Sequence, residues 1–362
     1  MMKAENGILI TRTDRIGDVV LSLPAIRTIS KAYPDEPLHM MVSSYAYPIV
    51  ENYPGLSSVI RYEPEDGSNK VSRTKQLIQH IRDLKIKRAL MLVYDADVLS
   101  IIKKAGIKER FGPLTKISGM FGYTAWRSQH RSKVEQHELE YNLSLLDMLG
   151  IKDRSYDVNL DLPVSKNNVT LAFEILKREG FERPYNGYII IHPGCGGSAL
   201  NWRYAYYAEI ASRLAESTGL PIVLTGSEYE ATILASIKQH IRGVVYNTAG
   251  KFSLKELIAL ISEAKLFIGP STGPMHIAAA TSVPLVAIFS PIKVQSVKRW
   301  GPYSRESIAV APRVECPAKI KCLGEKCSYY NCMDNVSVDE VFEKAKKVYD
   351  DSVQQMGLGL SF

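Results

Sequence analysis

The sequence lacks any apolar run long enough to cross a bilayer, although 46% of its 362 residues are hydrophobic. Its beginning, MMKAENGILITRTD, has neither the apolar core nor the cleavage site of a secretory signal. It also lacks a strong charge of one sign, since +7 is a modest excess over so long a chain, and it contains no recognisable nucleic-acid-binding module. We therefore expect a cytoplasmic protein, at most peripheral on the inner face of the membrane, with anionic small molecules or anionic lipid as partners and no nucleic acid.

Cysteine is also scarce, with five in the chain, and four of them crowd toward its end. In a cytoplasmic protein such a group favours metal ligands or free thiols over disulfides. The group has none of the tight C-x-x-C pairs of common zinc sites, and no histidine lies among its members. We expect free thiols by default and keep a structural zinc site as the alternative at these residues, Cys316, Cys322, Cys327 and Cys332.

Positive charge is concentrated in one segment, Lys103–Lys133, where basic residues alternate with aromatic and apolar ones. Such a segment can lie against anionic lipid headgroups. A solvated face of helices and loops, with some aromatics in the core, accounts for the same pattern equally well. The residues concerned are Lys103, Lys104, Lys108, Arg110, Lys116, Arg127, Arg131 and Lys133, with Phe111, Met120, Phe121, Tyr123 and Trp126 among them.

The first half of the chain alternates short apolar runs with longer amphipathic ones. This alternation indicates the order β-α-β-α-β, and hence a parallel sheet with helices on both faces. Near residues 156–168 the pattern breaks into a segment that resembles an interdomain connection. The expected strands are Gly7–Thr11, Leu38–Val42 and Arg88–Tyr94, and the expected helices are Asp18–Tyr33 and Thr74–Leu84.

The second half repeats this pattern, so we predict two α/β domains, at residues 1–165 and 166–338. Residues 339–362 form a last helix and tail, which we expect to pack back across the domain junction. The expected helices are Val169–Glu179, Tyr204–Thr218, Leu254–Glu263 and Asp339–Val353, and the expected strands are Tyr188–His192, Pro221–Thr225, Lys265–Gly269 and Val283–Phe289.

Three turns of small or hydroxyl-bearing residues follow strands of the second half: His192–Ser198, Thr225–Glu228 and Pro270–Gly273. Open parallel sheets bind ligands at the carboxyl ends of their strands. A small-residue turn that opens a helix aims backbone N–H groups and the positive end of the helix dipole at one point, which is a place to hold a phosphate. Each turn alone is also an ordinary strand-to-helix connection. Together they predict a nucleotide site, with Glu228 either accepting hydrogen bonds from ribose or base or simply solvated.

The turn after the first strand, Thr11–Asp18, has a different character. Gly17 permits a tight bend, and Asp18 then lies at the start of a helix. In a structural role, Asp18 stabilises the helix by capping it or through the helix dipole. In a catalytic role, its carboxylate can act as a general base, although a helix N-terminus favours the ionised form and so lowers its basicity. Three neighbours either orient an anionic acceptor or pair with one another: Arg12, Asp14 and Arg15.

Three motifs of the sequence resemble those of the glycosyltransferase family 9 heptosyltransferases. The run TDRIGDVVLSLPA at 13–25 is similar to the family's N-terminal signature. HPG at 192–194 with the following Asn201 and Trp202, and PSTGPMHIAA at 270–279, are similar to its two donor-side motifs. The resemblance runs from the first strand to the last helix, with the motifs in order and at the expected separations.

The resemblance implies a GT-B fold, in which two Rossmann-like domains with parallel sheets face a central cleft. The acceptor site lies in the first domain and the nucleotide-sugar site in the second. It also implies an inverting, metal-independent transfer that needs no cofactor, with ADP-heptose as the donor and a lipopolysaccharide core, or a related lipid-linked surface glycan, as the acceptor. By the same resemblance Asp18 is the catalytic base, and Ser271, Thr272 and Gly273 form the diphosphate-binding turn with His276 behind it. From the resemblance together with the turns described above, we expect Arg12, Arg15 and Gly17 on the acceptor side. The expected donor side comprises His192, Gly194, Gly196, Gly197, Ser198, Asn201, Trp202, Arg203, Thr225, Gly226, Glu228, Ser271, Thr272, Gly273 and His276.

Two positions depart from the family pattern. Ser271 stands where Asp is common, and no lysine stands shortly before Trp202. We expect Arg203 and the turn 196–198 to meet the phosphate charge instead. Two other functions fit the same fold: a nucleotide-sugar-binding protein without catalysis, and an epimerase or hydrolase that uses further carboxylates such as Asp95, Asp97 or Glu228.

Overall fold

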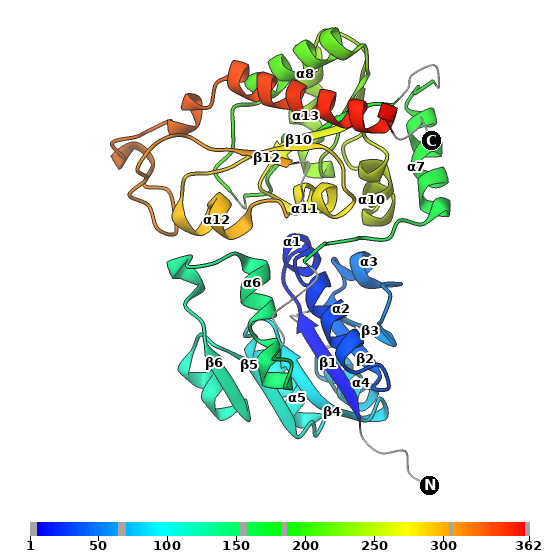
Figure 1. The fold of residues 1–362 in the computed structure, drawn as a ribbon, viewed down its shortest axis with the longest axis vertical. Helices are drawn as coiled ribbons and strands as arrows, with labels where there is room; N and C mark the ends of the chain where they lie inside the picture. Colours follow the sequence, from blue (N-terminus) through cyan, green and yellow to red (C-terminus); the bar gives the residue numbers. More distant parts are fainter. Residues whose placement is uncertain are drawn as a thin grey trace. The chain divides into compact units, whose positions relative to one another are not determined.

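The computed structural model describes residues 6–63, 70–152, 158–182, 187–197, 199–303 and 307–358. The chain divides into two units, one of residues 1–131 and 135–158 and the other of residues 132–134 and 159–362. Each unit contains a parallel sheet of six strands with helices around it (Figure 1). The α/β class predicted from the alternation of apolar runs is confirmed.

The first unit is built on a sheet of order β3-β2-β1-β4-β5-β6. Every residue of β1 is buried and β1 pairs with β2 and β4, as expected for a parallel strand covered on both faces. The strand order reverses between β1 and β4, which is where such sheets bind ligands. The strands are β1 (Gly7–Arg12), β2 (Leu38–Ser43), β3 (Ser58–Tyr62), β4 (Ile86–Met91), β5 (Glu109–Leu114) and β6 (Ala125–Ser128), and the α-helices are α1 (Ile16–Val20), α2 (Leu23–Ala32), α3 (Tyr47–Val50), α4 (Lys70–Asp83), α5 (Ala96–Lys104) and α6 (Glu138–Leu143).

The single helix predicted over Asp18–Tyr33 is wrong, because the chain forms the two helices α1 and α2 there. Pro24 lies in the first turn of α2, where it has no N–H to donate and its ring would clash with the carbonyl four residues earlier in a continuous helix. The segment Lys103–Lys133, treated above only as basic and aromatic, begins at the end of α5 and contains β5, the short 3-10 helix η1 (Ile117–Phe121) and β6.

The second unit is built on a sheet of order β12-β11-β10-β7-β8-β9, whose strand order reverses between β7 and β10. Gly219 ends α8 in the left-handed conformation, at φ 70°, which glycine adopts without steric cost. The strands are β7 (Ile189–Ile191), β8 (Ile222–Leu224), β9 (Val245–Asn247), β10 (Leu266–Pro270), β11 (Leu285–Ile288) and β12 (Ser307–Val310), and the α-helices are α7 (Lys166–Arg178), α8 (Tyr204–Thr218), α9 (Ala231–Gln239), α10 (Leu254–Ser262), α11 (Gly273–Ala280), α12 (Val297–Trp300) and α13 (Val338–Leu358).

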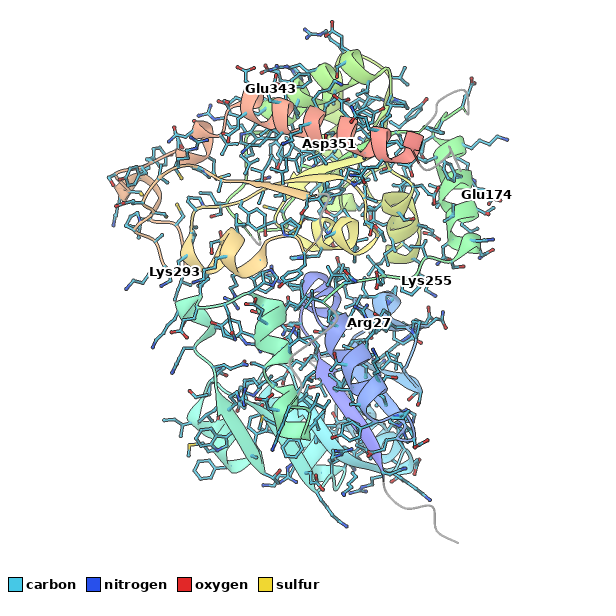
Figure 2. All side chains as sticks on the ribbon, viewed as in Figure 1. Arg27, Glu174, Lys255, Lys293, Glu343 and Asp351 are labelled. Atoms are coloured by element: carbon cyan, nitrogen blue, oxygen red, sulfur yellow. The ribbon has the colours of Figure 1, made fainter. Side chains whose placement is uncertain are left out.

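The last helix, α13, packs against α8 and against β10, β11 and β12 of the same unit (Figure 1). Its polar side chains Glu343 and Asp351 are exposed (Figure 2). The predicted tail beyond residue 358 lies outside the described residues, and the predicted packing across the junction stays a prediction. No helix in the described part of the chain combines the length and apolar character needed to span a membrane.

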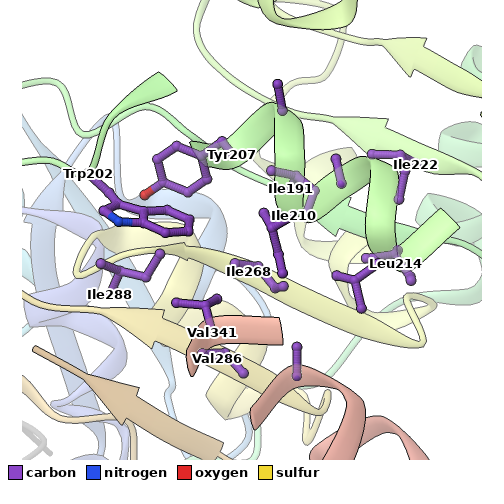
Figure 3. Packing of buried hydrophobic residues seen from close by; sticks show 14 of the residues in the cluster. Ile191, Trp202, Tyr207, Ile210, Leu214, Ile222, Ile268, Val286, Ile288 and Val341 are labelled. Atoms are coloured by element: carbon purple, nitrogen blue, oxygen red, sulfur yellow. The ribbon is translucent and has the colours of Figure 1, made fainter. Parts of the chain in front are cut away.

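The core of the second unit lies between α8, α13 and the sheet. Trp202 is 2% exposed and packs against Tyr207, while Ile191, Ile268 and Val341 meet in the same cluster (Figure 3). Burying side chains of this size contributes about 2–3 kcal/mol each before the cost of ordering them. The strands that end at the predicted turns are therefore held by well-packed side chains.

Candidate functional site

The three predicted donor turns lie side by side in the second unit. They begin at His192, Thr225 and Pro270, the carboxyl ends of β7, β8 and β10, and these strands are neighbours that run parallel. Two of the turns flank the point where the strand order reverses, which is the usual ligand position in an open parallel sheet. The structure thus brings together segments that are far apart in the sequence.

His192 shapes the first of these turns. Its ring is buried, lies against Phe267, and its Nδ1 is 2.9 Å from the Thr225 hydroxyl. Burial lowers the pKa of His192 to about 4, against a weaker opposite effect of Glu230. The imidazole is therefore neutral near pH 7 and links the first turn to the second.

Glycine is required at three positions of the His192 turn. Gly196 and Gly197 are exposed and have φ of 51° and 72°, so successive N–H groups are presented from a conformation that favours glycine. A Cβ on Gly194 would overlap the carboxylate of Glu230. Ser198, the remaining predicted member of this turn, lies outside the described residues.

Glu230 is a site residue that the sequence reasoning missed. Its Oε2 accepts hydrogen bonds of 2.8 Å from both the N–H and the hydroxyl of Ser227, which closes the turn after β8. The pattern S-x-x-E at 227–230 is that of a capping box and was the available signal. The predicted residue Glu228, two positions before Glu230, is exposed. The carbonyl of Gly226, also predicted, accepts a backbone hydrogen bond from the N–H of Gly250.

The third turn opens α11 with Thr272 as the capping residue. Ser271, Thr272 and Gly273 are half-buried, and the Ser271 N–H donates to the carbonyl of Ile288, so it completes the sheet instead of pointing at a ligand. Pro274 has no N–H. The Thr272 hydroxyl donates to the carbonyl of Pro270 at 3.3 Å, so the groups of this turn that can meet an anion are the N–H groups of Thr272 and Gly273 and the Ser271 hydroxyl. His276 is buried behind them, with its ring edge toward Trp300.

The motif residues after the first turn support it from behind. Asn201 donates to the carbonyl of Pro193 at 2.6 Å, and the Trp202 indole N–H donates to the carbonyl of Val336 at 2.9 Å within the core. Arg203, expected to stand in for a phosphate-binding lysine, forms a bidentate ion pair with Asp334. Its charge is thus already balanced by a neighbour.

The four late cysteines line a cavity of about 550 Å³ together with Arg203 and Asp334. All four are free thiols, and burial, followed by the neighbouring thiols, raises the pKa of Cys332. Within the described ranges, no group of three or more His, Cys, Asp or Glu is arranged to hold a metal ion. The choice between free thiols and a structural zinc site at these four cysteines stays a prediction.

In the first unit, the turn after β1 is organised by a buried arginine. Arg12 is 1% exposed and donates to Asp14 and Asn142, both at 2.8 Å, and to Glu138 at 3.1 Å. It also pairs with Asp18. Of the two alternatives for these charges, pairing with one another is therefore realised for Arg12 and Asp14.

Asp18 lies in the first turn of α1, and its side chain is 12% exposed. Burial is the largest cause that raises its pKa to about 7, the carboxylate of Asp14 adds to it, and Arg12 opposes it. The effect expected of the helix N-terminus, which favours the ionised form, is opposed by this burial, and the role of Asp18 as a base stays a prediction. Arg15 precedes α1 and is exposed, and Gly17 is buried within it.

The basic segment divides into structural and surface residues. Arg110, Arg127 and Arg131 donate to backbone carbonyls within the unit. In contrast, Ile117 and Phe121 on η1 are 76% and 79% exposed. Tyr123 belongs to the core, while Trp126 is 43% exposed and the five lysines of the segment are exposed. Contact of this exposed part with anionic lipid stays a prediction.

A model of the family described as glycosyltransferase family 9 (heptosyltransferase) matches residues 62–331. The lipopolysaccharide core heptosyltransferase OpsX of Haemophilus influenzae is 24% identical over 361 residues, covering 96% of this chain and 98% of that protein. Among solved structures, a family 9 glycosyltransferase of Veillonella parvula superposes with a TM-score of 0.81 at 18% identity, over 97% of this chain and 99% of that one. ADP-heptose lipopolysaccharide heptosyltransferase II of Escherichia coli superposes with a TM-score of 0.76 at 20% identity, over 96% and 99%.

Proposed function

The chain belongs to glycosyltransferase family 9, and from that premise we propose that it transfers heptose from ADP-heptose to a lipopolysaccharide core or a related surface glycan. The relatives named above support this donor and acceptor by their own activities. The observation that carries the proposal is the row of turns on β8, β7 and β10, together with the largely buried Asp18 carboxylate paired with Arg12 after β1 of the first unit. The GT-B class expected from the resemblance agrees with these solved folds.

The proposed reaction is a single displacement with Asp18 as general base. The acceptor hydroxyl loses its proton to the Asp18 carboxylate while its oxygen attacks the anomeric carbon, and the bond from that carbon to the diphosphate breaks. Attack opposite the leaving group inverts the configuration. A base with a pKa of about 7 is well matched to this work, since it is substantially ionised near neutral pH yet still binds the proton that it takes up.

The departing diphosphate carries the charge that the second unit has to stabilise. The three turns contain no lysine or arginine, so the proposal assigns this task to backbone N–H groups at Gly196, Gly197, Thr272 and Gly273 and to the start of α11. These groups are fixed before the reaction and need no metal ion in this scheme. His192 stays neutral and holds the turns in register.

The acceptor's lipid anchor gives the surface of the first unit a role. The exposed apolar residues of η1, Ile117 and Phe121, lie in a segment where Glu109 is the single acidic residue between Lys103 and Lys133. We include peripheral contact with anionic lipid in the proposal. The full-length protein is expected to float with vesicles rich in phosphatidylglycerol and not with phosphatidylcholine vesicles, and Phe121→Ser is expected to weaken flotation without changing unfolding.

A donor screen tests the function directly. Purified protein is incubated with ADP-heptose or other nucleotide sugars, with and without a lipopolysaccharide-core acceptor, and products are identified by mass spectrometry. We expect heptose on the acceptor, of inverted configuration by NMR, with the rate unchanged by EDTA. Rapid turnover without acceptor would identify a hydrolase or epimerase instead. Asp18→Asn is expected to bind ADP normally and to lose about 10²–10⁴-fold in rate, whereas equal activity of this variant would refute the role of Asp18.

A further inference from the structure

The ion pair between Arg12 and Asp18 continues into two more buried charges. Glu138, at the start of α6, is 0% exposed, and its Oε1 accepts from Arg12 at 3.1 Å. The same oxygen accepts from Arg131. Arg131 also donates to the carbonyl of Leu92, one residue beyond β4, at 2.6 Å. Glu138 therefore bridges two guanidinium groups at the point where the first sheet reverses its strand order.

The charges of this cluster do not cancel until one proton is added. Three carboxylates, Asp14, Asp18 and Glu138, surround Arg12, and Arg131 adds the second positive charge. With every group ionised the sum is −1, and protonation of one carboxylate brings it to zero. Asp14 is 33% exposed, whereas Asp18 and Glu138 are largely enclosed, so the excess negative charge is costly where it lies on these two, because the interior solvates it poorly. The cluster thus favours the uptake of one proton.

Solvent access separates the two carboxylates that share the Nη2 group of Arg12, those of Asp18 and Glu138. The more exposed Asp14 binds Arg12 through Nε instead. Glu138 is fully enclosed between the two arginines, so a substrate hydroxyl has no approach to it, whereas the Asp18 side chain is 12% exposed. Asn142 fixes the other side of the cluster, donating to the carbonyl of Leu21 at 3.1 Å and accepting from Arg12. Glu138 is therefore placed to act on Asp18 through Arg12 and not on substrate.

We infer that Glu138 is a positioning residue for the transfer, supported by Arg131: it holds Arg12 against Asp18 and supplies the negative charge that drives the acceptor's proton onto Asp18. This inference rests on the proposed function of Asp18 as the base. Neither Glu138 nor Arg131 belongs to the motifs that resemble the family. Arg131 lies in the basic segment Lys103–Lys133. The proton moves from the acceptor oxygen to the Asp18 carboxylate, and Glu138 stays ionised throughout.

The test compares Glu138→Gln with Glu343→Gln, which removes the same charge from an exposed position on α13 (Figure 2). The pH dependence of kcat/KM is measured with ADP-heptose and core acceptor. Loss of the facing carboxylate is expected to move the acid inflection about one pH unit lower and to reduce kcat about tenfold, with the donor KM unchanged. Arg131→Gln is expected to move the inflection the opposite way, because it removes a positive charge. Glu343→Gln should match the wild type.

A conservative variant separates positioning from simple loss of folding. Glu138→Asp keeps the charge and is expected to restore the inflection toward the wild-type value, even if its kcat stays low. If Glu138→Gln does not fold, the inference is tested by the other two variants: the acid inflection of kcat/KM should move to higher pH in Arg131→Gln and stay near the wild-type pH in Glu138→Asp. A uniform fall in kcat with every inflection at the wild-type pH would overturn the inference, since a purely structural role predicts that result.

A readout without turnover distinguishes this inference from the proposed function. The midpoint of thermal unfolding is followed against pH for wild type, Asp18→Asn, Glu138→Gln and the double variant. We expect the pH-dependent difference between wild type and Asp18→Asn to shrink in the Glu138→Gln background. An absent heptosyl transfer with this coupling intact would refute the proposed function alone, and additive behaviour of the two substitutions would refute the link between Glu138 and Asp18.

Discussion

Replacing Gly194 by alanine tests the packing that shapes the proposed donor turn. A Cβ at this position would overlap the carboxylate of Glu230, with Oε2 only 2.6 Å away. The backbone of Gly194 does not have a positive φ, so alanine is compatible with its conformation. The whole effect of Gly194→Ala should therefore come from displacing Glu230.

The magnitude follows from the hydrogen bonds that Glu230 would lose. Its Oε2 accepts from the Ser227 N–H and hydroxyl, both at 2.8 Å. Each such bond contributes about 1 kcal/mol, less where the group is half-exposed, so the expected cost is roughly 1–2 kcal/mol. For a unit of this size that is a fall in the unfolding midpoint of roughly 2–8 °C. ADP is expected to bind more weakly as well, because the turns after β7 and β8 share this contact.

A double-mutant cycle supplies the refutation. Glu230→Ala removes the side chain that the new Cβ would displace, so adding Gly194→Ala to it should cost almost nothing. The double variant should therefore be destabilised by roughly 1–2 kcal/mol less than the sum of the two single variants. Gly197→Ala is the matched control, because its φ of 72° makes it strained whatever the neighbour, and nothing lies near its Cβ. Unfolding is followed by circular dichroism and ADP binding by calorimetry. If Gly194→Ala costs as much in the Glu230→Ala background as in the wild type, the reasoning is wrong.

Three further predictions concern Asp18, the thiols and Trp202. Burial raises the Asp18 pKa from 3.8 to about 7, so the folded protein holds this proton more tightly than the unfolded chain does. The free energy of unfolding of the wild type should therefore fall, relative to that of Asp18→Asn, as the pH rises from below 4 to above 7, by at most about 4 kcal/mol. Urea unfolding of both proteins at about pH 5 and about pH 8.5 measures this change, and an equal stability difference between wild type and Asp18→Asn at the two pH values would contradict it. Iodoacetamide should modify exposed Cys322 first and buried Cys332 last by peptide mass spectrometry, whereas the reverse order would contradict the cavity. Trp202→Phe should cost roughly 2–3 kcal/mol through its lost core volume and its bond to Val336, with ADP affinity in the remaining folded protein unchanged in calorimetry.

The sequence predicts the site's place in the second unit better than its contacts. A strand buried on both faces is a continuous apolar run, so residues 188–192 were enough to locate β7 and the turn after it. The half-buried strands β9 and β12 were missed, because three or four residues of mixed burial make no clear pattern. The ion pair of Arg203 with Asp334 joins residues 131 apart, and no local signal predicts it.

The electrostatics of the first unit show the same limit more sharply. Arg12 meets Glu138 and Asn142 at separations of 126 and 130 residues. Arg12 and Asp14 stand close to Asp18 in the sequence, but burial is the largest cause that raises the Asp18 pKa, and the sequence does not show it. Asp14 adds to the shift, and Glu138, which only the fold brings near, adds a smaller contribution. Burial and the folded distances therefore decide the direction of the shift.

The two units carry similar sheets but place opposite kinds of chemistry at the same point of their topology. At the reversal between β1 and β4 lies a cluster of five ionisable groups around the buried Arg12, whose net charge changes when one proton is taken up. At the reversal between β7 and β10 lie turns without a cation, with a neutral histidine and fixed N–H groups. Taking up a proton requires a group with a tunable pKa, whereas stabilising a departing diphosphate requires donors that stay unchanged through the reaction. Ser271 stands where the family commonly has Asp, so this turn lacks a negative charge that the family pattern carries, and we expect the donor preference of this chain to differ from that of its relatives at this residue.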